Sequence, residues 1–468
     1  MKIQGETDTL FTALRESAKR ESVSAIEKLI LDAPDRELCR INVLAFAVRH
    51  ELDEDDVIAA FLHAARIGIF DMSWNILCPA CGGVLDSGAT LKTVKQAEYR
   101  CVLCAAECEP TLDDIVEVTF TVSPRVRRIA AHEPETLSWA EYYRQVFWSS
   151  CVDLPDDHTF EKWVKETTLD ALEIAPGEKV VLSLDLPEGV IDVFDPVVNM
   201  SQSIEVKGEP ANQSQSLSFI MTRDHAPAGD IQMRPGPLKL TLENRSNVRT
   251  LPAIWIVSDK IHELVNKRRP FLTAKRLLTN QTFRDIHRTD ALDVDQRLKI
   301  TSLTFLFTDL KGSTELYERV GDLAAYDLVR AHFRVLNEIV AAERGAVVKT
   351  IGDAVMATFP TPGRAMAAAL KMREALKDLK GDLLLKIGIH EGPCLAVSLN
   401  DRQDYFGTTV NIAARVQGLA TSRSIFATSR VVTDAQASKL LQSSGIAATP
   451  EKRSLRGIAR QIEIFEIP

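Results

Sequence analysis

Residues 304–314, Thr304-Phe-Leu-Phe-Thr-Asp-Leu-Lys-Gly-Ser-Thr314, join an apolar strand to a carboxylate and a small-residue turn. The apolar run predicts a buried strand that ends near Asp309. A second stretch, residues 347–357, places Asp353 in a similar setting, Thr-Ile-Gly-Asp-Ala-Val. Two carboxylates brought together by a sheet can hold hard divalent ions through oxygen. The last third of the chain therefore points to phosphoryl chemistry, and backbone N–H groups for phosphate would come from Gly312, Ser313 and Thr314.

Strand and helix signals alternate from residue 301 to residue 468. Apolar residues at helical spacing follow Asp322 and stop at Gly345, before the strand that leads to Asp353. A further helix, a strand over 383–389 and a hairpin follow. The pattern predicts an α/β sandwich with mixed strand directions.

Composition sets the broad class of this chain. Its 468 residues suffice for roughly three domains, and its net charge is -9. Negative charge argues against nucleic acid or an anionic membrane as the main partner. No run approaches the roughly 20 apolar residues that would span a bilayer, and the N-terminus carries no apolar signal region. We expect a soluble, cytoplasmic protein with no membrane partner.

The N-terminal segment, residues 1–75, is expected to be a helical, winged-helix-like module. Asp53-Glu-Asp-Asp56 places acidic groups where a helix start favours them. A protein-docking or purely structural bundle is the favoured interpretation, because the segment has acidic stretches and no basic recognition helix.

Four cysteines between residues 76 and 125 have metal-binding spacing. Cys78-Pro-Ala-Cys81 is followed, after 19 residues, by Cys101-Val-Leu-Cys104. Each Cys-x-x-Cys turn can aim two thiolates at one ion, and four sulfurs leave no position for a substrate. We expect a structural zinc ribbon; a redox pair or chance spacing is the alternative.

Three further segments lead to the catalytic region. Residues 126–171 are predicted to be a helical connector. Short strands in residues 172–258, separated by turns such as Pro235-Gly-Pro237, predict a β-sandwich. Residues 259–300 are expected to be a helical linker with local basic residues. A solvated helix face is the usual role of such a charge run, and its position suggests a coupling element.

Four motifs in order resemble the class III nucleotidyl cyclase catalytic domain, over about residues 303–467. They are Phe-Thr-Asp-Leu-Lys-Gly-Ser-Thr, Lys-Thr-Ile-Gly-Asp-Ala-Val-Met-Ala, Gly-Ile-His-Glu-Gly-Pro and Phe-Gly-Thr-Thr-Val-Asn-Ile-Ala-Ala-Arg. The resemblance implies a ferredoxin-like α/β sandwich over 301–468. The upstream modules resemble the uncharacterised N-terminal region of some bacterial adenylyl cyclases, and a regulatory role is expected for them.

The resemblance implies that Asp309 and Asp353 hold two Mg²⁺ or Mn²⁺ ions, with the carbonyl of Leu310 as a further ligand. The implied reaction converts ATP to 3′,5′-cyclic AMP and pyrophosphate. The ribose 3′-hydroxyl attacks the α-phosphate in line, so one ion acidifies the nucleophile and the other steadies the leaving phosphates.

Base selection is implied at Lys349 and Asp404. Adenine offers an amino donor beside a ring-nitrogen acceptor, which suits a carboxylate and an ammonium, whereas guanine reverses both demands. Asp404 is placed by counting back from Asn411 without a gap, and Asp401 is the alternative. The pair also separates this chain from the lysine–threonine relatives associated with bicarbonate stimulation.

The remaining implied site residues divide between two helix positions and two phosphate contacts. Asn411 would orient the ribose, and Arg415, four residues on, would stabilise charge on the transferring phosphate. Lys386 and Arg456 fall where the family holds the β- and γ-phosphates. The family site lies between two catalytic domains, so a homodimer with two equivalent sites is implied.

Two other functions remain open from sequence. One is a guanylyl cyclase or a cyclase of mixed specificity. The other is a non-catalytic binding regulator that uses the zinc-ribbon and winged-helix-like modules. No pocket motif identifies a regulatory ligand or protein for the N-terminal modules.

Overall fold

The computed structural model describes residues 2–94, 98–104, 106–222, 231–258, 263, 266–287, 292, 296–311, 318–376, 384–399, 402–420 and 424–468. The chain divides into two compact units. The N-terminal unit comprises Met1–Ala89, Gln96–Glu109 and Glu117–Leu272, and the C-terminal unit comprises Thr90–Lys95, Pro110–Val116 and Thr273–Pro468. None of the described helices combines the length and apolar character that a membrane span requires.

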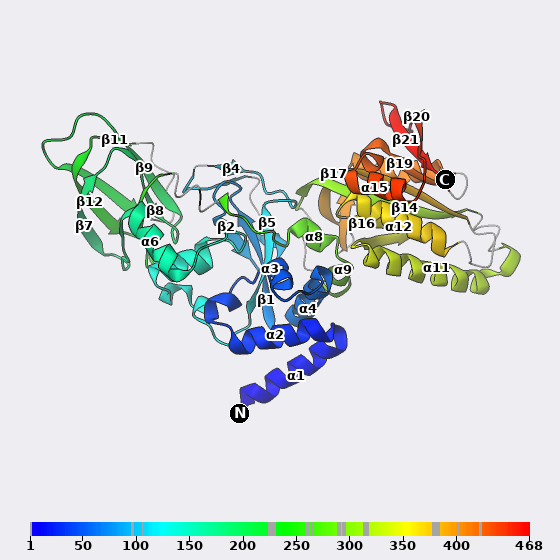
Figure 1. Ribbon diagram of the computed structural model, residues 1–468, viewed down its shortest axis with the longest axis horizontal. Coiled ribbons are helices and arrows are strands. Elements are labelled where there is room, and N and C mark those ends of the chain that lie inside the picture. The colour runs from blue at the N-terminus through cyan, green and yellow to red at the C-terminus, as the bar shows by residue number, and fades with distance from the viewer. Residues whose placement is uncertain are drawn as a thin grey trace. The chain divides into compact units, whose positions relative to one another are not determined.

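The N-terminal unit begins with helices and a small sheet. The helices are α1 (Lys2–Ser17), α2 (Arg20–Asp32), α3 (Val43–Arg49) and α4 (Glu54–Arg66), coloured blue in Figure 1. The Asp53 side chain caps α4 by accepting from the backbone N–H groups of Asp55 and Asp56. The sheet has the order β2-β1-β5, with β1 at Phe70–Leu77, β2 at Val84–Gly88 and β5 at Val116–Val122.

Residues 70–75, which we grouped with the helical module, are part of strand β1. Phe70, Met72 and Trp74 recur at the two-residue period of a strand, and this alternation outweighs the helical context. The winged-helix-like interpretation of the module stays a prediction.

The connector contains less α-helix than predicted. It includes α5 (Trp139–Tyr142), a π-helical turn (Tyr143–Phe147) and α6 (Asp157–Thr167). Its last residues form strand β6 (Thr168–Ala171), which pairs with β13 (Ala253–Ile256).

Two sheets follow, drawn in green in Figure 1. One has the order β10-β12-β7 and the other β11-β9-β8-β13-β6. Buried residues from both, such as Leu240 and Val193, belong to one apolar cluster, so the two sheets enclose a shared core. The strands are β7 (Lys179–Leu186), β8 (Gly189–Asp195), β9 (Met200–Val206), β10 (Gln215–Met221), β11 (Ile231–Met233) and β12 (Gly236–Asn244).

The C-terminal unit is built on an eight-stranded sheet. Its order is β15-β16-β14-β17-β19-β21-β20, and β18 pairs with β17 beside this path. The strands are β14 (Leu298–Lys311), β15 (Ala346–Ile351), β16 (Ala354–Phe359), β17 (Leu384–Leu399), β18 (Arg402–Phe406), β19 (Ile425–Thr428), β20 (Thr449–Arg453) and β21 (Ile462–Ile467). The helices are α8 (Ala274–Leu278), α9 (Gln281–Ile286), α11 (Asp322–Ala342), α12 (Pro362–Ala375), α13 (Thr408–Gly418), α14 (Ser429–Val432) and α15 (Ala435–Ser443).

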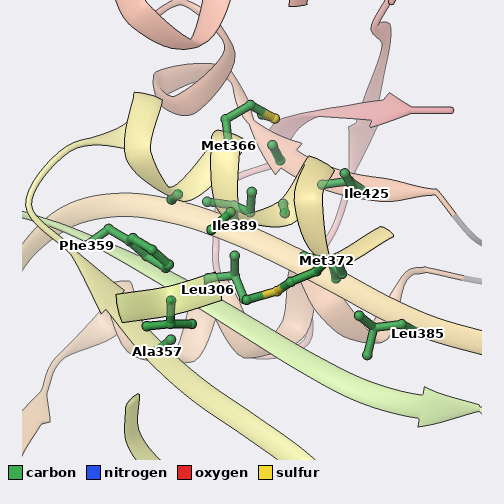
Figure 2. Packing of buried hydrophobic residues seen from close by; sticks show 14 of the residues in the cluster. Leu306, Ala357, Phe359, Met366, Met372, Leu385, Ile389 and Ile425 are labelled. Atoms are coloured by element: carbon green, nitrogen blue, oxygen red, sulfur yellow. The ribbon is translucent and has the colours of Figure 1, made fainter. Parts of the chain in front are cut away.

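Helices cover both faces of this sheet. Figure 2 shows Met366 and Met372 of α12 packed near Leu306 and Ile389 of the central strands, all buried in one cluster. Ile425 and Ala427 join that cluster, whereas Phe426 joins a second one with Ile412 and Val416 of α13. Successive strand residues point to opposite faces, so α12 and α13 lie on opposite faces of the sheet. The mixed α/β layering predicted for this region is confirmed.

Candidate functional site

Lys349 and Asp404 come from strands that are not neighbours in the sheet. Lys349 lies on β15 and Asp404 on β18, 55 residues apart in sequence, and the ammonium donates to Asp404 Oδ2. The other carboxylate oxygen accepts from the Tyr405 N–H at 2.8 Å. The Asp404 side chain is 10% exposed and that of Lys349 41%, so an ammonium open to a ligand stands beside an oriented, buried carboxylate.

A β-bulge sets the direction of Lys349. Val347 pairs with Ala357 and Lys349 with Met356, so Val348 is the extra residue on β15. An extra residue re-aims the side chains that follow it. The carboxylate considered as an alternative, Asp401, lies outside the described residues.

Asp309 and Asp353 lie at the same end of two paired strands. Thr308 of β14 pairs with Val355 of β16, which places Asp309 next to the turn that carries Asp353. Gly352 has φ +63°, a left-handed conformation that glycine adopts without strain, and it turns β15 into β16. Lys386 is the cross-strand partner of Asp309, and its Nζ lies 3.9 Å from Asp309 Oδ2.

The electrostatics of this corner favour a cation. Burial raises the pKa of Asp309, the Asp353 charge raises it further, and Lys386 opposes the shift. One oxygen of Asp353 is buried and accepts no hydrogen bond from the described residues. Repulsion between two carboxylates and a buried oxygen without a donor are both relieved by a divalent ion with oxygen ligands. The residues therefore fit the predicted Mg²⁺ or Mn²⁺ site. Leu310 is buried on the same strand.

Helix α13 carries Asn411 and Arg415 and packs closely against β17. A Cβ on Gly388 would lie 2.1 Å from the backbone nitrogen of Gln417, so only glycine permits this approach. Asn411 is exposed. The Arg415 guanidinium lies close to Gly457, where an added Cβ would be 3.5 Å from Arg415 Nη2. Gly457 follows the exposed Arg456. Within the described residues, no hydrogen bond or ion pair joins Arg415 to the carboxylate of Asp309 or of Asp353. The predicted phosphate contacts Gly312, Ser313 and Thr314 lie outside the described residues.

Two residues near these groups were not anticipated from sequence. His332 on α11 is buried, which lowers its pKa to about 4, and the charge of Asp353 opposes that shift. Arg284 on α9 contacts the strands of the Lys349–Asp404 pair. A histidine at a helical core position and an arginine in a short basic segment carry no distinguishing sequence signal.

The four cysteines of the predicted ribbon converge in the N-terminal unit. Cys78 and Cys81 follow β1, and Cys101 and Cys104 lie between β3 (Tyr99–Arg100) and β4 (Glu107–Cys108). The Cys78–Cys104 and Cys81–Cys101 sulfur separations are 3.4 and 3.6 Å, and all four sulfurs lie within 4.8 Å of one another. Tetrahedral zinc with sulfurs at about 2.3 Å requires separations of about 3.8 Å.

Hydrogen bonds also favour thiolates in this cluster. Backbone N–H groups of Cys81 and Gly83 point at the sulfurs of Cys78 and Cys81. The cluster is compatible with zinc.

Comparisons with known proteins divide the chain in two. Residues 4–285 match the family described as "Family of unknown function (DUF5939)", and residues 296–457 match "Adenylate and Guanylate cyclase catalytic domain". Among curated relatives, adenylate cyclase 2 of Rhizobium meliloti is 33% identical over 132 residues, covering 25% of this chain and 36% of the relative. An adenylate cyclase of Mycosarcoma maydis is 30% identical over 170 residues, covering 31% of this chain and 7% of the relative. The match thus spans about a third or less of each relative.

Solved structures that are similar to this chain include the adenylyl cyclase CyaB from P. aeruginosa. It is 21% identical with a TM-score of 0.33, and the match covers 37% of this chain and 96% of that one. The guanylate cyclase domain of RhGC from Catenaria anguillulae in complex with GTP is 20% identical with a TM-score of 0.33, covering 36% and 97%. The chain belongs to the family of unknown function DUF5939, and its C-terminal region carries an adenylate and guanylate cyclase catalytic domain.

Proposed function

We propose that this protein converts ATP to 3′,5′-cyclic AMP and pyrophosphate. The ion pair of Lys349 and Asp404 is the observation behind the proposal: it lies in the sheet that carries Asp309 and Lys386, and Asp353 lies in the turn between β15 and β16 of that sheet. The relatives named adenylate cyclase support the same reaction. In this proposal a base-recognition pair and a metal-binding corner act on one nucleotide.

Lys349 and Asp404 select adenine. The carboxylate accepts from the exocyclic amino group, and the ammonium donates to the adjacent ring nitrogen. The Tyr405 N–H keeps Asp404 oriented while Lys349 turns toward the base. Guanine would set a carbonyl against the carboxylate and an N–H against the ammonium, and each mismatch leaves a buried polar group unpaired.

Asp309 and Asp353, with the Leu310 carbonyl, hold two Mg²⁺ or Mn²⁺ ions. Bound there, they would supply acidification of the ribose 3′-hydroxyl and neutralisation of the phosphate charge. The 3′-hydroxyl releases its proton to solvent as its oxygen forms a bond to the α-phosphorus, the bond from that phosphorus to the bridging oxygen breaks, and pyrophosphate leaves. Lys386 and Arg456 hold the β- and γ-phosphates, and the backbone at Gly312, Ser313 and Thr314 adds donors.

Asn411 and Arg415 act on a nucleotide bound by a second copy of the chain. Asn411 orients the ribose, and Arg415 stabilises the charge that develops on the α-phosphate. The exposure of Asn411 supports a role at a homodimer interface. The four cysteines hold a structural zinc, and the N-terminal modules regulate the catalytic region.

Complementation tests this shared site. Chains with Asp309→Ala and chains with Asn411→Ala should each form no cyclic AMP, because every site in each homodimer lacks one component. In an equimolar mixture about half of the dimers should be mixed, each with one intact site of two, so activity should return to about a quarter of the wild-type level. The exposed Asp327 on α11 provides a matched control, since Asp327→Ala should keep full activity. Absence of recovery in confirmed mixed dimers would refute the shared site.

A further inference from the structure

Arg284 connects the two strands that carry the base-recognition pair. Its Nη2 donates to the Gln403 carbonyl at 2.8 Å and lies 3.5 Å from the Val348 carbonyl. Gln403 immediately precedes Asp404, and Val348 immediately precedes Lys349. One guanidinium thus contacts the backbone next to both members of the pair.

The sheet itself does not provide this connection. Strand β15 pairs with β16, and β18 pairs with β17, so no ladder joins β15 to β18 in the described residues. Besides the Lys349–Asp404 ion pair, Arg284 of α9 therefore links the two strands at this point. The Arg284 guanidinium carbon also lies 6.0 Å from the ring centre of Tyr405, the residue after Asp404.

Helix α9 is itself anchored to the bulge of β15. The Gln281 side-chain oxygen accepts from the Val347 N–H at 2.8 Å, and Arg284 reaches the carbonyl of Val348, the extra residue of the bulge. The Asn280 side chain caps α9, and Phe283 is buried. A bulge leaves backbone groups outside the ladder. Here α9 supplies partners for those groups.

We infer that Arg284 is a positioning residue for base selection: its guanidinium sets the spacing of Lys349 and Asp404 by holding the backbones of β15 and β18. This inference rests on the proposed function of that pair. Arg284 falls within residues 4–285, the segment matched by the family of unknown function. Helix α9 thus lies at the end of the matched segment and packs within the C-terminal unit.

The test compares ATP with GTP. The ratio of kcat/KM for ATP to that for GTP should fall by about 3- to 30-fold in Arg284→Ala, the range expected for a residue that acts through others. Arg284→Lys, which keeps the charge without the planar fork, should give an intermediate ratio. Arg402→Ala is the matched control, because Arg402 is exposed on β18 one residue before Gln403, and it should leave the ratio unchanged.

A double-mutant cycle separates positioning from general stability. Loss of stability would lower turnover of both nucleotides together, whereas mispositioning lowers ATP turnover selectively. In an Asp404→Ala background, Arg284→Ala should change the ratio no further, because the pair is already broken. An undiminished effect in that background, or an unchanged ratio in Arg284→Ala, would overturn the inference while leaving the cyclase activity standing.

Two further outcomes concern the folding of the variant and the activity of the wild-type chain. If Arg284→Ala does not fold, Gln281→Ala removes the other anchor of α9 and must lower the ratio; an unchanged ratio there overturns the inference. If the wild-type chain forms no cyclic nucleotide, or does not favour ATP, the proposed function fails and the inference fails with it.

Discussion

Replacing Asp404 with alanine should reduce the preference for ATP. The carboxylate is 10% exposed and is held by the Tyr405 N–H, so it meets the adenine amino group already oriented. A hydrogen bond to a charged group contributes about 1.5–3 kcal/mol, and at 1.36 kcal/mol per factor of ten its loss lowers kcat/KM for ATP roughly 10- to 150-fold. Loss of the carboxylate creates no new mismatch with guanine, so the rate of GTP turnover should stay the same or rise.

The assay measures initial rates with ATP and with GTP in the presence of Mn²⁺, with the cyclic products separated chromatographically. Asp401→Ala is the matched control, because Asp401 is the nearby carboxylate that sequence counting left as an alternative. Asp404 does not select adenine if Asp404→Ala keeps the wild-type ratio of ATP to GTP turnover, or if Asp401→Ala loses that ratio.

Two further results are expected. Cys78→Ser and Cys101→Ser should lower bound zinc, measured by metal analysis of purified protein, while Cys394→Ser should not, since Cys394 is a buried cysteine of the other unit; unchanged zinc in the first two would contradict the ribbon. Burial lowers the pKa of His390 to about 4, so the folded state resists protonation and loses roughly 3 kcal/mol of stability as the pH falls from 6.5 to 4. His390→Gln should lose less of its thermal midpoint between pH 7.5 and 4.5 than wild type, and an equal loss in both proteins would count against this.

Local sequence signals located much of the site. Asp309 and Asp353 were found because an apolar strand that ends in a carboxylate is a local pattern, and the sheet then brings the two together. Lys349 and Asp404 were paired only through the family resemblance. Nothing in their local sequences indicates that β15 and β18 approach one another, since the strands are not neighbours in the sheet.

Other features depend on tertiary structure and could not be predicted. Strand β9, Met-Ser-Gln-Ser-Ile-Glu-Val, is rich in polar residues, and its buried positions become apparent only when it packs in a sheet. Arg284 lies in a basic segment whose residues usually face solvent. Its role follows from two backbone carbonyls that come from distant parts of the chain.

The product formed by the 468-residue chain from equimolar ATP and GTP with Mn²⁺ tests the proposed function most directly. We expect cyclic AMP and pyrophosphate in equal amounts, with cyclic GMP a minor product. Cyclic GMP as the major product would contradict the assignment of Lys349 and Asp404, and the absence of both cyclic nucleotides would contradict the proposed activity itself.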